Sequence, residues 1–199
     1  MGDQMPRVRA AVVQASPILL DREATVEKAC RLIEEAGDNG ARIVVFPETY
    51  IPGYCHWFWF YPAEGAQVMR FNKELFKNAV VVPSPTTDRL GQAARRAGCY
   101  VVMGINEKEA GTFGTMWNSI VFFNPEGEIA GRRRKIVPTL TERLVHTGGD
   151  GSGLTVIRTP WGGLSGLICG ENTNDLARFT MLAQGEVIHA ANWPAFALK

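Results

Sequence analysis

The stretch RIVVFPE, residues 42–48, joins an uninterrupted apolar run to an abrupt polar end. A short continuous run of aliphatic and aromatic residues is typical of a strand that is covered on both faces of its sheet. Pro47 ends the run, because proline has no backbone N–H to donate to a neighbouring strand. The stretch therefore predicts a buried strand over 42–46, with Glu48 just beyond its carboxyl end.

Hydrophobic patterns on either side of this strand predict the remaining elements. Strands are expected over 7–15, 99–105, 115–124, 128–134, 154–158, 163–168 and 186–192, and a long aromatic loop is expected over 50–62. Helices are expected over 22–36 with Asp21 as the cap, over 66–79 and 86–98, and from Asn172 or Asn174 to Gly185. Strand–helix–strand units mixed with hairpins predict a layered α/β domain, with one mixed sheet or two sheets.

The composition is that of an ordinary globular domain. The chain has 199 residues, of which 46% are hydrophobic and 21% charged, and its net charge is +1. So small a charge gives no reason to expect a nucleic acid or an anionic membrane as a partner, and no stretch approaches the roughly 20 apolar residues of a membrane span. The four cysteines are widely spaced and form no CxxC pair, so we expect no metal site and reduced thiols in the cytoplasm.

Three chemically active side chains share one position relative to their predicted strands. Glu48, Lys135 and Cys169 each follow the end of a strand, and ligands of open α/β sheets bind outside the carboxyl ends of the strands. If the three strands are neighbours, a carboxylate, an amine and a thiol meet in one pocket. The carboxylate can then take the thiol proton, while the ammonium favours the thiolate and stabilises a negatively charged intermediate.

Each of these residues also has a purely structural interpretation. Cys169 closes an apolar strand, and free cysteine is commonly a core residue. A Pro-Glu pair after a strand, as at Glu48, is typical of a solvated turn. The basic run Arg132–Lys135 is typical of a solvated, charged strand edge. Pattern and spacing alone therefore leave both interpretations open.

An ordered series of segments resembles the carbon–nitrogen hydrolase superfamily, and within it the nitrilase branch. IVVFPETYIPGY (43–54) resembles the segment that carries the catalytic glutamate, which falls on Glu48. GRRRKIVPTLTERLVHTGGDGSGL (131–154) resembles the lysine segment, and LSGLICGEN (164–172) resembles the nucleophile segment, so the catalytic lysine and cysteine fall on Lys135 and Cys169. VVQASP (12–17) resembles the family's first strand, and ANWPAF (191–196) resembles its Trp-Pro stretch.

The resemblance implies a four-layer α-β-β-α sandwich and a nitrilase that needs no metal or organic cofactor. An organic nitrile is then hydrolysed to a carboxylic acid and ammonia through a thioimidate and a thioester on Cys169. The family's second acid, which positions the lysine, maps to Glu142. The resemblance also implies a homo-oligomer, and a single domain over 1–199 that is C-terminally incomplete because the family domain continues further.

Two departures from the family pattern fall beside the expected catalytic residues. Nitrilases commonly carry Trp after the nucleophile, whereas this chain has Gly170, which removes a large pocket wall. Cys55 and His56 stand where a proline is usual, and we expect Cys55 to be a second, non-catalytic thiol. The substrate-binding residues expected from these segments are Gly170, Trp193, Tyr54 and His146.

Three alternatives to a nitrilase follow from the same residues. An amidase of the superfamily uses the same trio on a small amide, and Gly170 weakens the preference for a nitrile. A catalytically silent, oligomer-forming protein is the second alternative, although it has no reason to keep all three chemical types in place. The third is a Cys–His thiol hydrolase with His146 as base, which no motif supports.

Overall fold

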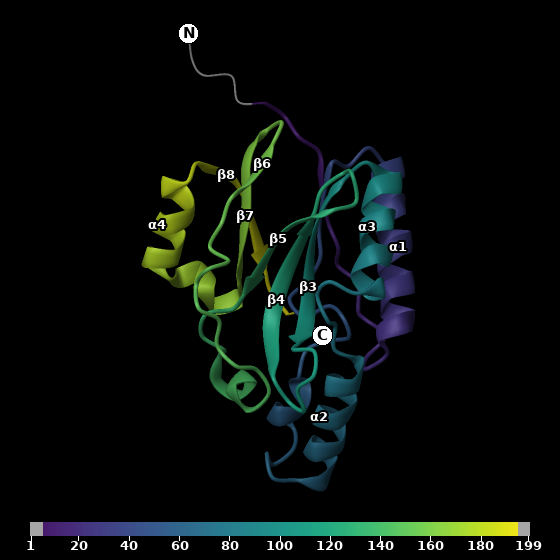
Figure 1. The fold of residues 1–199 in the computed structure, drawn as a ribbon, viewed down its shortest axis with the longest axis vertical. Coiled ribbons are helices and arrows are strands. Elements are labelled where there is room, and N and C mark those ends of the chain that lie inside the picture. Colours follow the sequence, from purple (N-terminus) through teal and green to yellow (C-terminus); the bar gives the residue numbers. More distant parts are fainter. Residues whose placement is uncertain (1–5, 195–199) are drawn as a thin grey trace.

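The computed structural model describes residues 6–194 and contains two β-sheets that lie face to face (Figure 1). The five-stranded sheet has the order β1 (Ala10–Val12), β2 (Ile43–Val45), β3 (Tyr100–Lys108), β4 (Met116–Phe123) and β5 (Ile129–Arg134). The three-stranded sheet has the order β6 (Ile157–Thr159), β7 (Gly162–Ile168) and β8 (Glu186–Asn192). Parallel pairs join β1 to β2, β2 to β3 and β7 to β8, and the other pairs are antiparallel.

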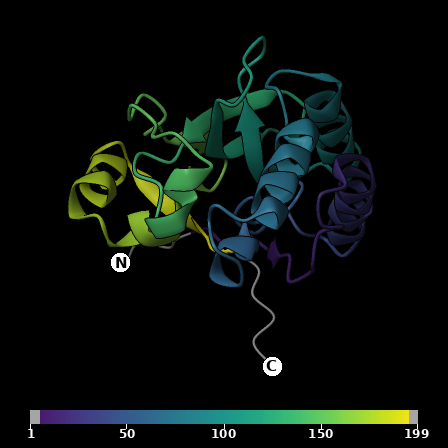
Figure 2. The ribbon, with the colours of Figure 1, turned by 90° about the horizontal axis from the view of Figure 1, so that it is seen from below.

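Helices cover the outer face of each sheet. Helices α1 (Arg22–Asp38) and α3 (Pro85–Ala97) lie side by side over the five-stranded sheet, and α4 (Asp175–Ala183) packs on the three-stranded sheet (Figures 1 and 2). Helix α2 (Ala66–Asn78) packs beside the aromatic loop that follows β2. The layers run helix, sheet, sheet, helix, which confirms the predicted α-β-β-α sandwich.

Side chains alternate between the two interfaces of this sandwich, as β-pleating requires. On β4, Ile120 and Phe122 face the three-stranded sheet, where they meet Leu164 and Ile168, whereas Val121 and Phe123 join the cluster under α1 and α3. Fully burying each such side chain contributes about 1.5–3 kcal/mol to stability. The continuous apolar strands of the sequence are therefore strands that are covered on both faces.

Most element bounds agree with the sequence expectations, but the strand expected over 7–15 is confined to Ala10–Val12, and the one expected over 154–158 lies at Ile157–Thr159. The strand over 186–192 matches β8, and Asp21 caps α1 by accepting a 3.0 Å hydrogen bond from the Ala24 N–H. Asn174, rather than Asn172, caps α4. Three short 3₁₀ helices were not predicted: η1 (His56–Trp59), η2 (Leu140–Leu144) and η3 (Cys169–Thr173). Single turns of this kind are too short to leave a hydrophobic period in the sequence.

The strands that precede Glu48, Lys135 and Cys169 are not neighbours, which corrects one condition of the sequence argument. Strands β3 and β4 separate β2 from β5, and β7 belongs to the other sheet. Their carboxyl ends still meet at one end of the sandwich. Strand β5 runs in the same direction as β2 and β3, because β4 is antiparallel to both β3 and β5, and the end of β8, which is parallel to β7, is hydrogen-bonded to the end of β2.

Within the described residues, no helix is long and apolar enough to cross a membrane.

Candidate active site

Lys135 lies between two acidic side chains in the interior at this end of the sandwich. Its Nζ donates a 2.9 Å hydrogen bond to Glu48 Oε1 and 2.9 Å hydrogen bonds to both carboxylate oxygens of Glu142. The three side chains are at most 1% exposed. We refer to Glu48, Lys135 and Glu142 as the charged cluster. Buried charges of this kind require their partners, because an unpaired ion in the interior is strongly destabilising.

The turn after β2 fixes Glu48 through backbone contacts on both sides. The Glu48 N–H donates to the Trp193 carbonyl at 2.9 Å, and Asn192 Nδ2 donates to the Phe46 carbonyl at 2.6 Å, so the end of β8 is joined to this turn. On the other side, a Cβ at Gly104 of β3 would lie 2.1 Å from the Pro47 carbonyl oxygen. Only glycine permits this approach, which presses the glutamate turn against the sheet.

Lys135 is placed by the two-residue period of β5. Arg132 and Arg134 point to one side, where both form ion pairs with Glu107. Arg133 and Lys135 are 2% and 1% exposed, and each is paired with buried carboxylates. The interpretation of this basic run as a solvated edge is therefore wrong for Arg133 and Lys135.

Glu142 is carried by η2 and held by neighbours from three segments. Tyr54 donates its hydroxyl to Glu142 Oε1 at 2.8 Å, and the Thr139 N–H donates to Glu142 Oε2 at 3.2 Å. Asn118 of β4 bridges the two acids, since its Nδ2 lies 2.6 Å from Glu48 Oε1 and 3.3 Å from Glu142 Oε2. Sequence reasoning missed Asn118, although an amide in the buried strand MWNSIVFF is a signal of a polar network.

The three charges shift one another's pKa values. Burial raises the pKa of Glu48 to about 7, and the attraction of Lys135 offsets this only in part. Burial also acts to raise the pKa of Glu142, but the Lys135 ammonium and the hydrogen bonds that Glu142 accepts outweigh it, so this pKa is lowered. Burial acts to lower the pKa of Lys135, but its carboxylate partners outweigh it and raise this pKa. Glu48 is therefore the member of the cluster that exchanges a proton near neutral pH.

Cys169 begins η3 at the end of β7, where the chain turns sharply. Its φ of 51° lies in the left-handed region, which non-glycine residues adopt uncommonly and which is enriched at functional sites. The thiol is half-buried, and burial raises its pKa to about 11, with Glu48 adding to the rise and Lys135 and the Gly170 N–H opposing it. The thiol is therefore protonated at neutral pH, and an attack by its sulfur requires a base.

One carboxylate oxygen of Glu48 is available to accept the proton of the thiol. Oε1 accepts the hydrogen bonds from Lys135 and Asn118, while the buried Oε2 has no hydrogen-bond partner among the described residues. A buried oxygen without a donor is costly to keep, so it is a candidate acceptor for a proton delivered from outside. The arrangement can thus combine a base, a fixed positive charge and a thiol.

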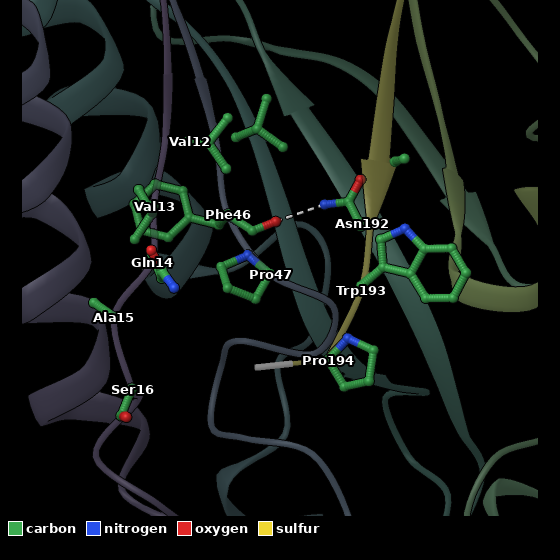
Figure 3. Close-up of a pocket in the computed structure, with 12 residues that line it drawn as sticks. Val12, Val13, Gln14, Ala15, Ser16, Phe46, Pro47, Asn192, Trp193 and Pro194 are labelled. Carbon is green, nitrogen blue, oxygen red and sulfur yellow. Dashed lines mark hydrogen bonds between the residues drawn. The ribbon is translucent and has the colours of Figure 1, made fainter. Parts of the chain in front are cut away.

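The expected substrate-binding residues lie in different environments. Tyr54 is 6% exposed and holds Glu142, and Gly170 is exposed on the turn after Cys169. Trp193 lines a groove of about 550 Å³ between the end of β1, the end of β2 and the end of β8, together with Val12 and Pro47 (Figure 3). A smaller cavity of about 190 Å³ reaches Glu48 and Tyr54. The substrate-binding roles of Tyr54, Gly170 and Trp193 stay predictions. Residues 195–196 of the Trp-Pro stretch lie outside the described residues.

His146 is an interior residue with a defined partner. Its Nε2 lies 2.8 Å from Asn106 Oδ1, and Asn106 Nδ2 donates to the Gly53 carbonyl, so the amide oxygen is the acceptor and His146 the donor. Burial lowers the pKa of His146 to about 4, which keeps the ring neutral. Its hydrogen-bond partner is Asn106 and not Cys169, which argues against the Cys–His alternative. The substrate-binding role of His146 stays a prediction.

Among the described residues, no group of three or more His, Cys, Asp or Glu side chains is placed to hold a metal ion. Cys55 is fully buried, and burial raises its pKa to about 12. The chemically distinctive feature of this end of the molecule is therefore the charged cluster with the Cys169 thiol.

Comparison with known proteins assigns the chain to a family. The model of the carbon–nitrogen hydrolase family matches residues 9–196. The chain belongs to the carbon–nitrogen hydrolase family. It is 42% identical over 195 residues to a protein named nitrilase 3 from an unknown prokaryotic organism, covering 97% of this chain and 58% of that relative. It is also 41% identical over 192 residues to an arylacetonitrilase of Hypocrea virens, covering 94% of this chain and 55% of that relative.

A solved carbon–nitrogen hydrolase from Helicobacter pylori has the same fold. It superposes with a TM-score of 0.68 at 25% identity, over 92% of this chain and 59% of the other. These matches confirm the family and the nitrilase branch that the sequence segments predicted. The chain spans a little over half the length of the curated relatives it matches.

Proposed function

We propose that this carbon–nitrogen hydrolase is a nitrilase that converts an organic nitrile and water to a carboxylic acid and ammonia. The observation that carries the proposal is the buried charged cluster, in which Glu48 keeps one oxygen without a donor beside a lysine that is held by two acids. Similarity to nitrilases at about 40% identity supports a nitrile as the substrate.

The first half of the reaction forms a covalent bond to sulfur. Glu48 takes the proton of the Cys169 thiol, and the sulfur adds to the nitrile carbon. The nitrile nitrogen takes the proton back from Glu48, which leaves a neutral thioimidate. Negative charge that develops on nitrogen is stabilised by the Lys135 ammonium and by the Gly170 N–H, both of which favour a negative charge at Cys169.

The second half of the reaction consumes water. One water adds to the thioimidate carbon, and the nitrogen departs as ammonia after it gains the protons of that water, which leaves a thioester. A second water, deprotonated by Glu48, attacks the thioester carbon. The sulfur leaves as a thiolate and recovers its proton, and the acid is released. In this scheme Glu142 holds Lys135 in place and keeps it charged, and Asn118 holds the two carboxylates by donating to both.

Ammonia release from phenylacetonitrile and from phenylacetamide tests the proposal. Cys169→Ala is expected to lower turnover of the nitrile by a factor of about 10³ or more, because the covalent route is lost. Cys30→Ala is the matched control, since Cys30 is also a half-buried free thiol and lies in α1, away from the cluster. It is expected to retain turnover within about twofold.

Two outcomes would overturn the assignment. Hydrolysis of the amide alone identifies an amidase, which uses the same thiol and base on a carbonyl carbon. Absence of turnover on both compounds, with Cys169 no more reactive toward iodoacetamide than Cys30, identifies a catalytically silent protein.

The setting in which the protein works is also part of the proposal. Residues 1–199 are proposed to belong to one domain, which the shared core between the two sheets supports. The four free cysteines support a reducing cytoplasm. The exposed apolar side chains Leu176, Phe179 and Leu182 on α4 support a homo-oligomer. Sedimentation velocity measures the last point, and a monomer across micromolar concentrations contradicts it.

A further inference from the structure

We propose that Glu171 is a positioning residue that fixes Cys169 relative to Lys135. The proposal rests on the proposed function, because it takes Cys169 as the nucleophile and Lys135 as the charge beside it. No hydrogen bond or ion pair joins the Glu171 side chain to either of these side chains. It acts through the backbone of the residues next to them.

One carboxylate joins the lysine segment to the nucleophile segment. Glu171 Oε1 accepts the N–H of Ile136, which follows Lys135 in the chain, at 2.8 Å. Glu171 Oε2 accepts the N–H of Ile168, which precedes Cys169, at 3.1 Å. The two catalytic segments come from different sheets, so this carboxylate bridges the sheets at the point where the chemistry takes place.

Arg133 balances the charge of the Glu171 carboxylate and restricts its movement. Its Nη2 donates to Glu171 Oε1 at 2.7 Å, and its Nη1 lies 3.4 Å from the Gly166 carbonyl of β7. Arg133 and Glu171 are 2% and 7% exposed. Arg133 and Lys135 are two residues apart and point to the same side of the sheet. Arg133 pairs with Glu171, and Lys135 pairs with the carboxylates of the charged cluster. A buried, fully paired carboxylate with two backbone donors has little freedom to move.

Glu171→Gln is the substitution expected to remove one of these two backbone contacts and keep the other. Both carboxylate oxygens are used: Oε1 faces Arg133 and Ile136, and Oε2 faces the Ile168 N–H. The amide of Glu171→Gln has a single acceptor oxygen and a donor NH₂ group in place of the other. When its oxygen serves Arg133 and Ile136, the NH₂ meets the Ile168 N–H, and the end of β7 loses its tether while the side-chain volume is unchanged.

The test measures the rate at which iodoacetamide alkylates Cys169, read by peptide mass, together with kcat and KM for phenylacetonitrile. In Glu171→Gln the alkylation rate and kcat are expected to fall by about tenfold or more, since displacements of about 1 Å cost up to about a hundredfold in rate. KM is expected to stay within about twofold, because Glu171 does not touch the substrate, and alkylation of Cys30 in the same sample is expected to be unchanged.

Glu107→Gln is the matched control. Glu107 is also a buried carboxylate paired with arginines of β5, Arg132 and Arg134, but its second oxygen accepts from Ser119, and it has no hydrogen bond to the turn Cys169–Thr173. A comparable loss of thermal stability is expected in both variants, whereas Glu107→Gln is expected to keep the Cys169 rate within about twofold.

The outcomes separate this proposal from the proposed function. Wild-type turnover of the nitrile tests the function by itself. The ratio of variant to wild-type alkylation tests Glu171: a loss of more than about fivefold that is absent in Glu107→Gln supports the bridge, and a smaller loss, or an equal loss in the control, overturns it. If Glu171→Gln does not fold, Glu171→Asp is judged by the same limits, because its carboxylate is one methylene too short to reach both N–H groups.

Discussion

The charged cluster and the nucleophile turn (Cys169–Thr173) meet at one end of the sandwich, but they are held in different ways. The cluster is almost fully buried, and its charged side chains bind one another. The turn is half-exposed and has a left-handed residue at its start. Its own side chains bind the backbone there: Glu171 accepts from Ile168, which precedes the turn, and Asn172 donates to the Cys169 carbonyl at 2.8 Å. The cluster therefore determines charge, and the turn determines position.

Removing the central cation is expected to have the largest effect on stability, because the cluster has no other positive charge. Lys135→Met leaves Glu48 and Glu142 buried without their cation, which costs about 3–5 kcal/mol of stability. Turnover is expected to fall by a factor of about 10² to 10³, the usual effect of removing a group that stabilises developing charge. Urea denaturation and kcat measure the two effects.

An exposed lysine supplies the control for this comparison. Lys77 pairs with Glu74 on the surface of α2, where its side chain is 55% exposed. Lys77→Met is expected to change stability by about 1 kcal/mol or less and to leave kcat unchanged. If both substitutions cost the same free energy of unfolding, the cluster is not the buried, mutually dependent unit described above.

The pH dependence of kcat/KM shows whether activity follows the ionisation of Glu48 in the cluster or of Cys169 in the turn. Glu48 must be ionised to act as base, and its pKa is raised to about 7, so activity is expected to rise with pH through about 7 and then level off. If a free thiolate had to form without a base, activity would rise instead toward the Cys169 pKa of about 11. A profile measured from about pH 5 to about pH 10 separates these cases, and Glu48→Gln is expected to abolish the limb near neutrality.

In both regions the chemically active side chains can be predicted from the sequence, whereas the side chains that position them cannot. Glu48, Lys135, Glu142 and Cys169 could be named because each lies in a segment that resembles the family and because strands β2, β5 and β7 carry clear apolar patterns. The contacts that position them could not be named. Those contacts, from Asn118, Arg133 and Glu171, join segments from different strands and sheets, and no local period records such pairings. Arg133 and Arg134 are adjacent in the chain, yet they serve opposite faces of β5.

The smallest effect is expected on the exposed side of the turn. A Cβ at Gly170 would meet only Thr139 Oγ1, at 3.7 Å, and the backbone there does not have the positive φ that excludes other residues. Gly170→Trp is therefore expected to change stability by no more than about 0.5 kcal/mol. It is expected to lower kcat/KM for phenylacetonitrile relative to propionitrile by about tenfold, because the indole narrows the approach to Cys169.

Substitution at an unrelated exposed glycine controls for the added indole. Gly114 lies between β3 and β4, where a Cβ meets no atom of residues 6–194 within 4 Å. Gly114→Trp is expected to leave the ratio of the two nitriles unchanged. An unchanged ratio in Gly170→Trp shows that residue 170 does not face the bound nitrile.

In the proposed reaction the sulfur at the end of β7 carries the reacting carbon, while the charged cluster transfers protons and stabilises developing charge. The most direct test is rapid acid quenching of the wild-type protein during turnover of phenylacetonitrile, followed by digestion and peptide mass measurement. We expect the peptide containing Cys169 to gain one phenylacetyl group in place of the thiol proton, and the peptides containing Cys30, Cys55 and Cys99 to be unmodified. Turnover with an acyl group on another cysteine, or continued turnover by Cys169→Ala, would contradict it.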